Sequence, residues 1–355
     1  MAYTTIDDPE AYFQSIAYTG NETARDMTLP GTTDMQPDFV WTKGRSFSDD
    51  NNAYDSLNGV NKYWAINRGW SIGTNSAPNL GVTAFNSDGF SLGVWSALNR
   101  DGETHIAWCW KGGTTSGINA TGADITPSSY TFSQDAGISI IRYTGNGSSG
   151  AKIAHGLGAK PAFIVCMNTA TNENRMTFHH RNTSAPETDY LLFNTTAVTT
   201  DAARWNDSLP GTVYFEVDDN DAANKSGDII TALCFAEKQG FSKFGTYTGN
   251  VDADGPFLYT GFRPAFFCFK ETGNAENWII YDNKRTDQAD KSNPIDNYLS
   301  NSATTAEASG VAVDFVSNGI KLRANNGHIN EGTYVFLAFA ESPFVNSSGV
   351  PCNAM

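Results

Sequence analysis

Histidines and carboxylates could carry catalysis or bind a metal ion, and their spacing in this 355-residue sequence limits both roles. The five histidines form neither an HExxH motif nor an H-x-x-x-H pair. His179 and His180 are adjacent, and on a strand they would point to opposite faces, which makes a shared metal ion difficult. His155 lies in a Gly-rich turn, where a structural role is favoured. No catalytic residue is predicted from these patterns.

Two acidic loops, residues 216–221 and 250–255, could offer oxygen ligands to Ca²⁺. Neither loop has the spacing of an EF-hand. A solvated acidic loop is therefore the favoured interpretation, and Asp252 and Asp254 are kept as weak calcium candidates. No cofactor is predicted.

Tryptophan is concentrated near the N-terminus, where six of the eight residues lie within residues 1–113. Amphipathic rings in loops can stack on sugars or contact another protein, whereas rings in apolar strands fill a core. Three tryptophans belong to apolar runs and are predicted to be core residues: Trp41, Trp108 and Trp110. Core filling is also favoured for the other three, but they lie in variable stretches and are the candidate ligand-binding residues: Trp64, Trp70 and Trp95.

Hydrolase chemistry has little support in the sequence. A glycosidase needs two carboxylates facing each other across a cleft, and no acidic pair recurs at a fixed spacing. GxSxG, P-loop and GxGxxG motifs are absent. We therefore expect a protein that is not an enzyme.

Three landmarks recur in one order along the chain. The first is the tetrapeptide Tyr-Thr-Gly-Asn, which begins at residues 18, 143 and 247. The second is a proline before an apolar run, at residues 37, 161 and 264. The third is an apolar run that contains one equivalent aromatic residue in each copy: Trp110, Phe235 and Phe339. The near-constant spacing of the landmarks predicts an internal repeat.

The landmarks read as β structure. Thr-Gly-Asn after an apolar strand is turn chemistry, in which glycine is free to take a positive φ. The uninterrupted apolar runs are typical of central strands covered on both faces. We predict an all-β protein of three tandem jelly-roll or concanavalin-like β-sandwich domains, at residues 1–113, 137–239 and 240–355, with a Gly/Ser/Thr-rich linker at 114–136.

Composition narrows the possible partners. The net charge of −15 repels phosphate groups, so no nucleic-acid partner is expected. No apolar run approaches ~18 residues, and the N-terminus lacks a signal-peptide pattern. We therefore expect no membrane insertion, and we expect folding to start in a reducing cytoplasm. The five cysteines form no CxxC pair and are predicted to be buried thiols.

The repeats together resemble a known family. The phrases that carry the resemblance are MAYTTIDDPEAYFQ, the YTGN turns, AHGLGAKPAFIV, NSDGFSLG and AFAESPFVNSSGVPCNA. They are similar to a tandem β-sandwich repeat family of virion proteins, tail-fibre-like or structural, from marine tailed bacteriophages. The first and third repeats depart from the HGLG phrase of the second. The resemblance implies a place on the virion and brings no catalytic residues.

Three functions remain open at this point. The first is a bacteriophage structural protein on the particle exterior, as a tail fibre or a capsid decoration, with other virion proteins as partners. The second is a lectin-like receptor-binding protein that engages host surface glycans, and a polysaccharide depolymerase is the third. We also expect a homotrimer held by the first repeat, with the N-terminal arm at residues 1–13 docked on a neighbouring subunit.

Overall fold

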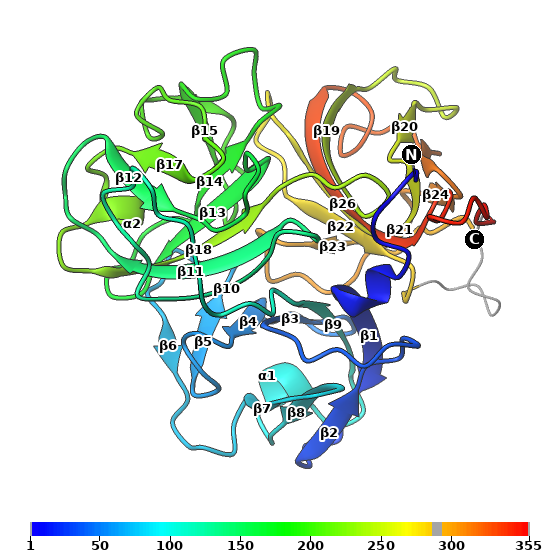
Figure 1. The fold of residues 1–355 in the computed structure, drawn as a ribbon. Helices are drawn as coiled ribbons and strands as arrows, with labels where there is room; N and C mark the ends of the chain where they lie inside the picture. The colour runs from blue at the N-terminus through cyan, green and yellow to red at the C-terminus, as the bar shows by residue number, and fades with distance from the viewer. Residues whose placement is uncertain (1, 286–292, 354–355) are drawn as a thin grey trace.

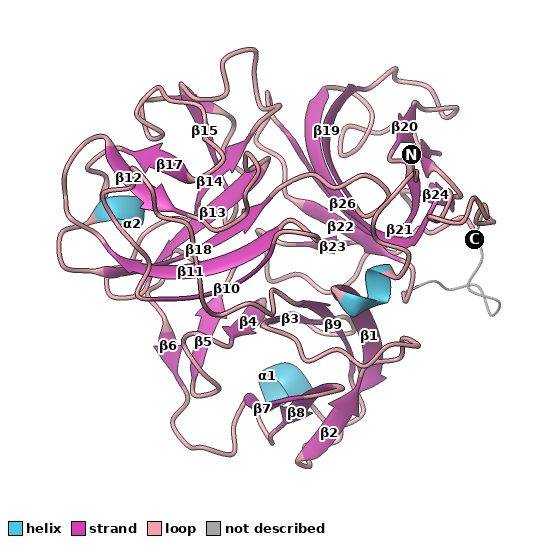
Figure 2. Ribbon diagram, in the orientation of Figure 1, coloured by secondary structure: helices cyan, strands magenta, loops and turns pink. Residues whose placement is uncertain are grey.

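The computed structural model describes residues 2–285 and 293–353, and it is all-β, with 41% of the chain in strands and 3% in helices. The strands form three lobes that surround a common centre (Figure 1). The helices are single short turns at the periphery of the sheets (Figure 2). They are η1 (Pro9–Ala11), α1 (Ser96–Asn99) and α2 (Asp221–Asn224).

Lobe 1, residues 13–113, pairs a large inner sheet with a small outer sheet. In spatial order, the inner sheet contains β1 (Phe13–Thr19), β9 (Thr104–Trp110), β3 (Phe39–Gly44), β4 (Asn52–Asp55), β5 (Lys62–Ala65) and β6 (Gly73–Thr74). The outer sheet contains β2 (Arg25–Thr28), β8 (Gly89–Leu92) and β7 (Val82–Asn86).

Lobe 2, residues 114–239, has the same plan with one added strand at the edge. Its inner sheet contains β10 (Ser129–Ser133), β11 (Ile138–Thr144), β18 (Ile229–Phe235), β13 (Phe163–Asn168), β14 (Met176–His179), β15 (Asp189–Leu192) and β16 (Thr200–Asp201). Its outer sheet contains β12 (Ala151–Ala154) and β17 (Tyr214–Val217). The added strand β10 comes from the segment that we predicted to be a linker, so this segment is part of the lobe 2 sheet.

Lobe 3, residues 240–353, repeats the plan again. Its inner sheet contains β19 (Ser242–Thr248), β26 (Thr333–Pro343), β21 (Phe262–Glu271), β22 (Ile279–Asp282) and β23 (Leu299–Ser300). Its outer sheet contains β20 (Phe257–Tyr259), β25 (Gly319–Leu322) and β24 (Val313–Val316).

Strand register aligns the three lobes residue by residue. Trp110, Phe235 and Phe339 each lie on the second strand of the shared order and are 3%, 7% and 1% exposed. Each pairs with a phenylalanine on the next strand: Trp110 with Phe39, Phe235 with Phe163, and Phe339 with Phe266. The predicted equivalence of the three aromatic residues is confirmed.

The inner strands are buried on both faces, as their apolar runs predict. All residues of β3 and β13 are buried, and their side chains alternate between two cores. On β3, Trp41 faces the core at the centre of the molecule, whereas Val40 faces the core between the two sheets of lobe 1. Each inner sheet therefore has one face on its own outer sheet and one face on the other lobes.

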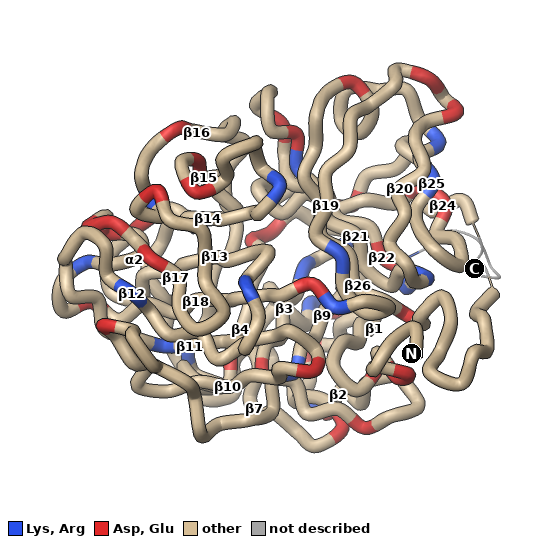
Figure 3. Tube along the Cα trace, turned by 45° about the horizontal axis from the view of Figure 1, so that its top comes forward, with Lys and Arg blue, Asp and Glu red and all other residues tan. Residues whose placement is uncertain are grey.

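Most charged residues lie on the outside of the lobes. Figure 3 shows acidic residues spread around the outside of all three lobes, in keeping with the net charge of −15. None of the described helices is long and apolar enough to cross a membrane. The division into three jelly-roll or concanavalin-like domains stays a prediction.

Replacing Phe235 with Ala should lower the free energy of unfolding by about 3 to 5 kcal/mol, because the ring fills a site between lobes that cannot collapse freely. Chemical denaturation followed by tryptophan fluorescence measures the change. The matched control is Phe257→Ala on β20, where the side chain is 46% exposed and we expect a change within about 0.5 kcal/mol. Equal losses in the two variants would contradict the central position of Phe235.

Candidate functional site

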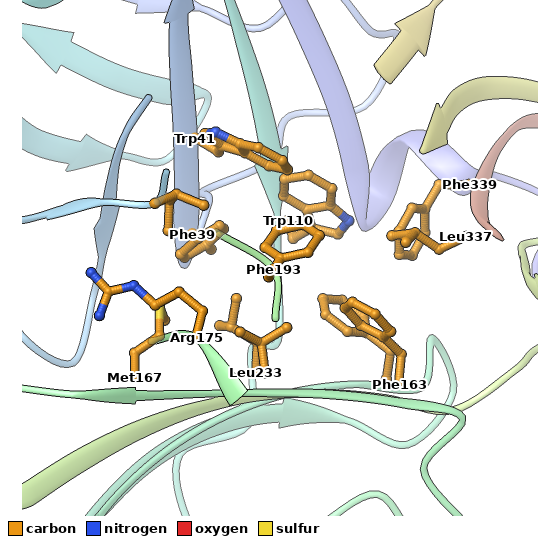
Figure 4. A pocket seen from close by; sticks show the side chains of 13 residues that line it. Phe39, Trp41, Trp110, Phe163, Met167, Arg175, Phe193, Leu233, Leu337 and Phe339 are labelled. Carbon is orange, nitrogen blue, oxygen red and sulfur yellow. The ribbon is translucent and has the colours of Figure 1, made fainter. Parts of the chain in front are cut away.

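The largest aromatic cluster of the molecule lies where the three lobes meet. The ring centroids of Trp110 and Phe235 are each 5.6 Å from that of Phe339, so one ring from each lobe meets at the centre. The cluster surrounds a cavity of about 30 Å³ with apolar walls. Figure 4 shows aromatic rings turned toward this space and the guanidinium group of Arg175 directed away from it. The cavity is too small for a ligand larger than one or two water molecules, so the centre is a packing core.

A ring of hydrogen bonds joins the lobes at equivalent positions. In each lobe, the residue before the fourth strand is fully buried, and its side chain donates to a backbone carbonyl of a neighbouring lobe. The three acceptors also occupy one position, at the end of the fifth strand. The pairs are Arg175 with Ala65 (Nη2 to O, 3.2 Å), Trp278 with Leu192 (Nε1 to O, 2.9 Å) and Asn51 with Ser300 (Nδ2 to O, 3.4 Å). Lobe 2 thus bonds to lobe 1, lobe 3 to lobe 2, and lobe 1 to lobe 3.

Arg175 carries a buried positive charge within this ring. Its guanidinium group donates to the carbonyls of Ala65 and Trp70 and lies over the ring of Trp64, with Cζ 5.3 Å from the centroid. Burial lowers its pKa to about 9. The group is therefore fixed between two lobes by backbone carbonyls and an aromatic face.

A buried ionic cluster closes the junction between lobes 1 and 3. Arg285 Nε is 2.6 Å from Asp282 Oδ2, and its Nη1 is 2.7 Å from Glu307 Oε2. Glu307 also accepts two hydrogen bonds from Arg45 of lobe 1, at 2.8 and 2.9 Å. Burial raises the pKa of the Glu307 carboxyl, but the hydrogen bonds and charges of Arg45 and Arg285 outweigh it and hold that pKa below its usual value. Trp108 Nε1 donates to Asp282 Oδ2 over 2.9 Å, which ties lobe 1 to the same carboxylate.

Four of the five histidines are structural. His179 and His180 extend from lobe 2 to lobe 3, where their Nε2 atoms lie 3.1 Å from the carbonyl oxygen of Phe336 and 2.7 Å from that of Phe244. His155 accepts a hydrogen bond from the Leu157 backbone N–H at Nδ1, in agreement with its predicted role in a turn. The fully buried His105 stacks its ring on Tyr18 at 5.2 Å.

The N-terminal arm docks within its own chain. Tyr3 donates its hydroxyl hydrogen to the carbonyl of Gly261 in lobe 3, and Thr4 donates to the carbonyl of Gln239, the last residue of lobe 2. Phe13 stacks on Phe339 at 5.4 Å. The expectation that this arm binds a neighbouring subunit is wrong, because lobe 3 of the same chain occupies it.

The candidate tryptophans have three different environments. Trp64 is fully buried, and its Nε1 donates to Asp55 Oδ2 over 2.9 Å. A ring without exposed surface cannot stack on an external ligand, so the binding role considered for Trp64 is wrong and the favoured core role holds. Trp70 is 51% exposed and lies under the guanidinium of Arg68. Trp95 is half-buried beside Tyr63, with ring centroids 4.9 Å apart.

Of the two weak calcium candidates, Asp254 is paired with cationic side chains. Asp254 Oδ1 lies 2.7 Å from Lys321 Nζ and 3.9 Å from Arg323 Nη1. Asp252 accepts the backbone N–H of Asp254. The described residues contain no group of three or more His, Cys, Asp or Glu side chains that could hold a metal ion. The structure therefore gives the weak calcium interpretation no support, since Asp254 is already paired with cationic side chains.

The prediction of buried thiols is confirmed for four of the five cysteines and is wrong for Cys352. Cys109, Cys166, Cys234 and Cys268 are fully buried, and Cys352 is partly exposed. Burial raises the pKa of the Cys166 thiol to about 12. These four side chains act as small apolar core groups.

The sequence prediction missed a buried asparagine that explains the Tyr-Thr-Gly-Asn repeat. In lobe 2, Asn224 Oδ1 accepts the backbone N–H of Asn146, and Nδ2 donates to the carbonyls of Ser148 and Asp218. The Tyr143 hydroxyl donates to the carbonyl that precedes Asn224. The same bonds recur at the equivalent asparagines, Asn99 and Asn330. An apolar residue, Asn and a charged residue recur here in all three repeats, and this pattern could have identified the asparagines.

The glycine of the repeated turn has a different role from the predicted one. Gly145 does not adopt a positive φ. A Cβ atom at this position would lie 2.4 Å from the carbonyl oxygen of Lys225. Glycine is thus required by the close approach of two backbone segments.

Two surface sites that are lined in part by aromatic side chains could bind a ligand. The first is a pocket of about 210 Å³ in lobe 1, where Tyr63 and Trp95 face the polar side chains of Thr74, Asn75 and Ser76. The second is a groove of about 440 Å³ beside β19. Aromatic faces next to hydroxyl and amide groups can bind a sugar ring, whereas an open strand edge can bind an extended peptide.

A family model described as a domain of unknown function (DUF7483) matches residues 8–343. The chain belongs to the DUF7483 family. The match runs from η1 to the last residue of β26 and so spans all three lobes. A search of curated proteins and a search of solved structures each gave no match.

The stability of this DUF7483 protein should decrease between pH 7 and pH 5. Burial lowers the pKa of His179 to about 3 and the pKa values of His105 and His155 to about 4. An unfolded histidine titrates near pH ~6.5, so below that pH the unfolded chain takes up protons that the folded chain refuses. Above pH ~6.5 the buried histidines are neutral in both states and do not lower the free energy of unfolding. Below that pH, each of them lowers the free energy of unfolding by at most about 1.4 kcal/mol per pH unit.

Urea denaturation at several pH values measures this slope. His179→Gln should reduce the slope, because one buried histidine is removed. The control is His328→Gln, whose side chain is 47% exposed and lies in lobe 3. A free energy of unfolding that stays constant from pH 7 to pH 5 would contradict the buried neutral histidines.

Replacing Asn224 with Ala should lower the free energy of unfolding by about 3 kcal/mol or more. The substitution removes three partly buried hydrogen bonds of a fully buried side chain, and each such bond contributes about 0.5 to 1.5 kcal/mol. The matched control is Asn220→Ala, which removes the N-cap of α2 and should cost about 1 kcal/mol. Thermal and urea denaturation compare the two, and a smaller loss for Asn224→Ala than for Asn220→Ala would contradict the proposed role.

Proposed function

We propose that this protein is a structural component of a bacteriophage virion, displayed on the particle exterior as a tail fibre or a capsid decoration, and that it is not an enzyme. The observation that carries the proposal is the use of its buried polar groups. Arg175, Arg285, Asp282 and His179 all bind other groups of the protein at lobe junctions. Such groups make a rigid scaffold. The sequence resemblance to virion proteins supplies the location.

The finer fold assignment belongs to the same proposal. Each lobe packs an inner sheet on a smaller outer sheet, as a jelly-roll or concanavalin-like sandwich does. We propose that the three lobes are tandem copies of one such domain. Synthesis in the host cytoplasm accords with the buried free thiols of lobes 1 to 3.

A homotrimer on the particle stays part of the proposal, with a changed interface. The interface was expected on the first repeat, but four of its six tryptophans are buried within one chain: Trp41, Trp64, Trp108 and Trp110. The N-terminal arm is also used internally. Contacts between subunits must therefore come from exposed surface elsewhere on the lobes.

Particle location can be tested directly. Mass spectrometry of density-gradient-purified bacteriophage should find this chain at a stoichiometry matching other particle proteins. Protease added to intact particles should remove it, whereas internal proteins survive. Absence of the chain from purified particles, or protection inside them, would refute the exterior role.

A second candidate function is lectin-like binding of host surface glycans, which the lobe 1 pocket favours. Tyr63 and Trp95 present aromatic faces at an angle of 58° beside polar groups of residues 74–76. A sugar offers an apolar face and a ring of hydroxyl groups, which match these two kinds of lining. A depolymerase is less favoured, because this pocket is lined by no carboxylate among the described residues and the β19 groove by one, Glu237.

Substituting Trp95 with Ala should reduce glycan retention about tenfold or more, because the stacking surface is lost. A glycan array of host polysaccharide fragments measures retention. Trp70→Ala is the control, since Trp70 is exposed and lies outside the pocket. Retention that depends on Trp70 and not on Trp95 would move the glycan site, and shortening of the polysaccharide would establish a depolymerase.

A further inference from the structure

The strands β1, β11 and β19 occupy equivalent positions in the three inner sheets, at or next to a sheet edge. Each lobe protects this strand in a different way. In lobe 2, β10 pairs with β11 along five residues. In lobe 1, the side chain of Gln14 on β1 donates to the carbonyls of Glu10 and Thr33 and fixes the following loop against the strand. The space left there is about 20 Å³. In lobe 3, β19 borders a groove of about 440 Å³.

The outer edge of β19 has backbone groups ready to pair. Just before β19, Phe241 accepts the backbone N–H of Ala340 on β26, and just after β19, Gly249 donates to the carbonyl of Gly332, which precedes β26. Since every second residue of an antiparallel strand bonds to the same neighbour, the N–H and C=O of Thr246 point away from β26. Both Thr246 and Thr248 are exposed.

Lobe 2 shows how this edge is filled. By register with the repeated Tyr-Thr-Gly-Asn turn, Thr246 is equivalent to Arg142. The carbonyl of Arg142 accepts the backbone N–H of Ser128, which leads into β10, over 2.8 Å. The chain therefore contains an example of an extended segment bound at this position.

The aromatic residues of β10 suggest what the groove receives. Tyr130 and Phe132 lie at alternate positions of β10 and contact each other at 5.9 Å. They pair with Ile141 and Ser139, so they share the face of the sheet on which Tyr143 is buried. In lobe 3, this side of β19 faces β20, where Phe257 is 46% exposed and Tyr259 is 53% exposed. Large exposed apolar side chains are infrequent on this protein, and two of them line this groove.

Charge specifies one end of the groove. The ring of His180 already bonds to the carbonyl of Phe244, so an added strand can pair with β19 only from Thr246 toward Thr248. If that strand runs antiparallel to β19, as β10 does to β11, its C-terminal end lies beside His180. Arg181 is exposed at this end, and within the described chain no carboxylate lies within ion-pair distance of its guanidinium. Lys243 is paired with Glu237 at 2.7 Å. A carboxylate on the incoming segment would find its partner in Arg181.

We propose that the groove beside β19 binds an extended segment of a partner protein by β-strand addition. The segment carries aromatic residues at two alternate positions and an acidic residue shortly after them, as residues 130–135 of this chain do. Main-chain pairing with Thr246 supplies affinity, and the aromatic groove and Arg181 supply selectivity. The inference does not depend on the particle location proposed above.

The probe is a fluorescein-labelled peptide with the sequence of residues 127–136, PSSYTFSQDA. Fluorescence polarisation with the full chain should show saturable binding. Thr246→Pro removes the outward N–H and leaves the β26 ladder intact, because proline is tolerated at edge strands. We expect it to weaken binding at least tenfold. The control is Thr19→Pro, an exposed position on the edge strand of lobe 1, which should bind as the unmodified protein does.

A charge exchange tests the orientation without altering the backbone. Arg181→Glu should weaken the peptide at least fivefold, and a peptide with Lys in place of the Asp should recover the loss. The proposal would be overturned if the peptide bound with equal affinity to the unmodified protein, Thr246→Pro and Arg181→Glu while their melting temperatures were unchanged. It would also be overturned if no binding were seen at about 1 mM protein. Self-association that Thr246→Pro abolishes would also overturn it, because the occupant would then be a second copy of the chain.

Discussion

The structure depends on inner sheets that have two apolar faces. An outer sheet covers one face of each inner sheet, and nothing within the same lobe covers the other. The free energy of leaving such a face in water is large, since each buried aromatic or aliphatic side chain contributes roughly 1.5 to 3 kcal/mol. Three such faces meet in one cluster that contains Phe13 of lobe 1, Phe163 of lobe 2 and Phe339 of lobe 3. The lobes are therefore parts of one folding unit, in which each lobe completes the core of the other two.

The ring of inter-lobe hydrogen bonds shows how the repeats could diverge without losing this arrangement. Asn51, Arg175 and Trp278 differ in size and charge, yet each places an N–H group at the same point. Their acceptors are backbone carbonyls, whose positions follow from strand geometry and do not change with the side chain. A substitution that keeps a donor is tolerated, whereas loss of the donor leaves a buried carbonyl unsatisfied. The repeated backbone geometry thus preserves the inter-lobe hydrogen bond, although the donor residue differs in each lobe.

The strands and their equivalence could be predicted from the sequence, because apolar runs, turns and spacing are local properties. Trp110, Phe235 and Phe339 were placed correctly by spacing alone. The neighbours of Trp64 could not be predicted, since Arg175, whose guanidinium lies over its ring, is distant in the sequence and belongs to another lobe. The ion pair of Asp254 could not be predicted for a related reason: Lys321, the cation that pairs with it, lies on a strand far along the chain. Contacts between lobes follow from how the lobes pack, and no local pattern records that packing.

The arrangement of three lobes in one chain also determines how many copies of each binding site a molecule carries. A cyclic trimer of identical subunits carries three copies of every surface site. A ligand with several linked binding groups can then occupy more than one copy at once. This chain builds its ring from three unlike lobes, so the pocket at Trp95 and the groove beside β19 each occur once per molecule. A single chain is then monovalent for each ligand, and weak binding stays weak in free solution. Avidity arises when many copies are held on one support, where effective concentration multiplies the affinity of each site.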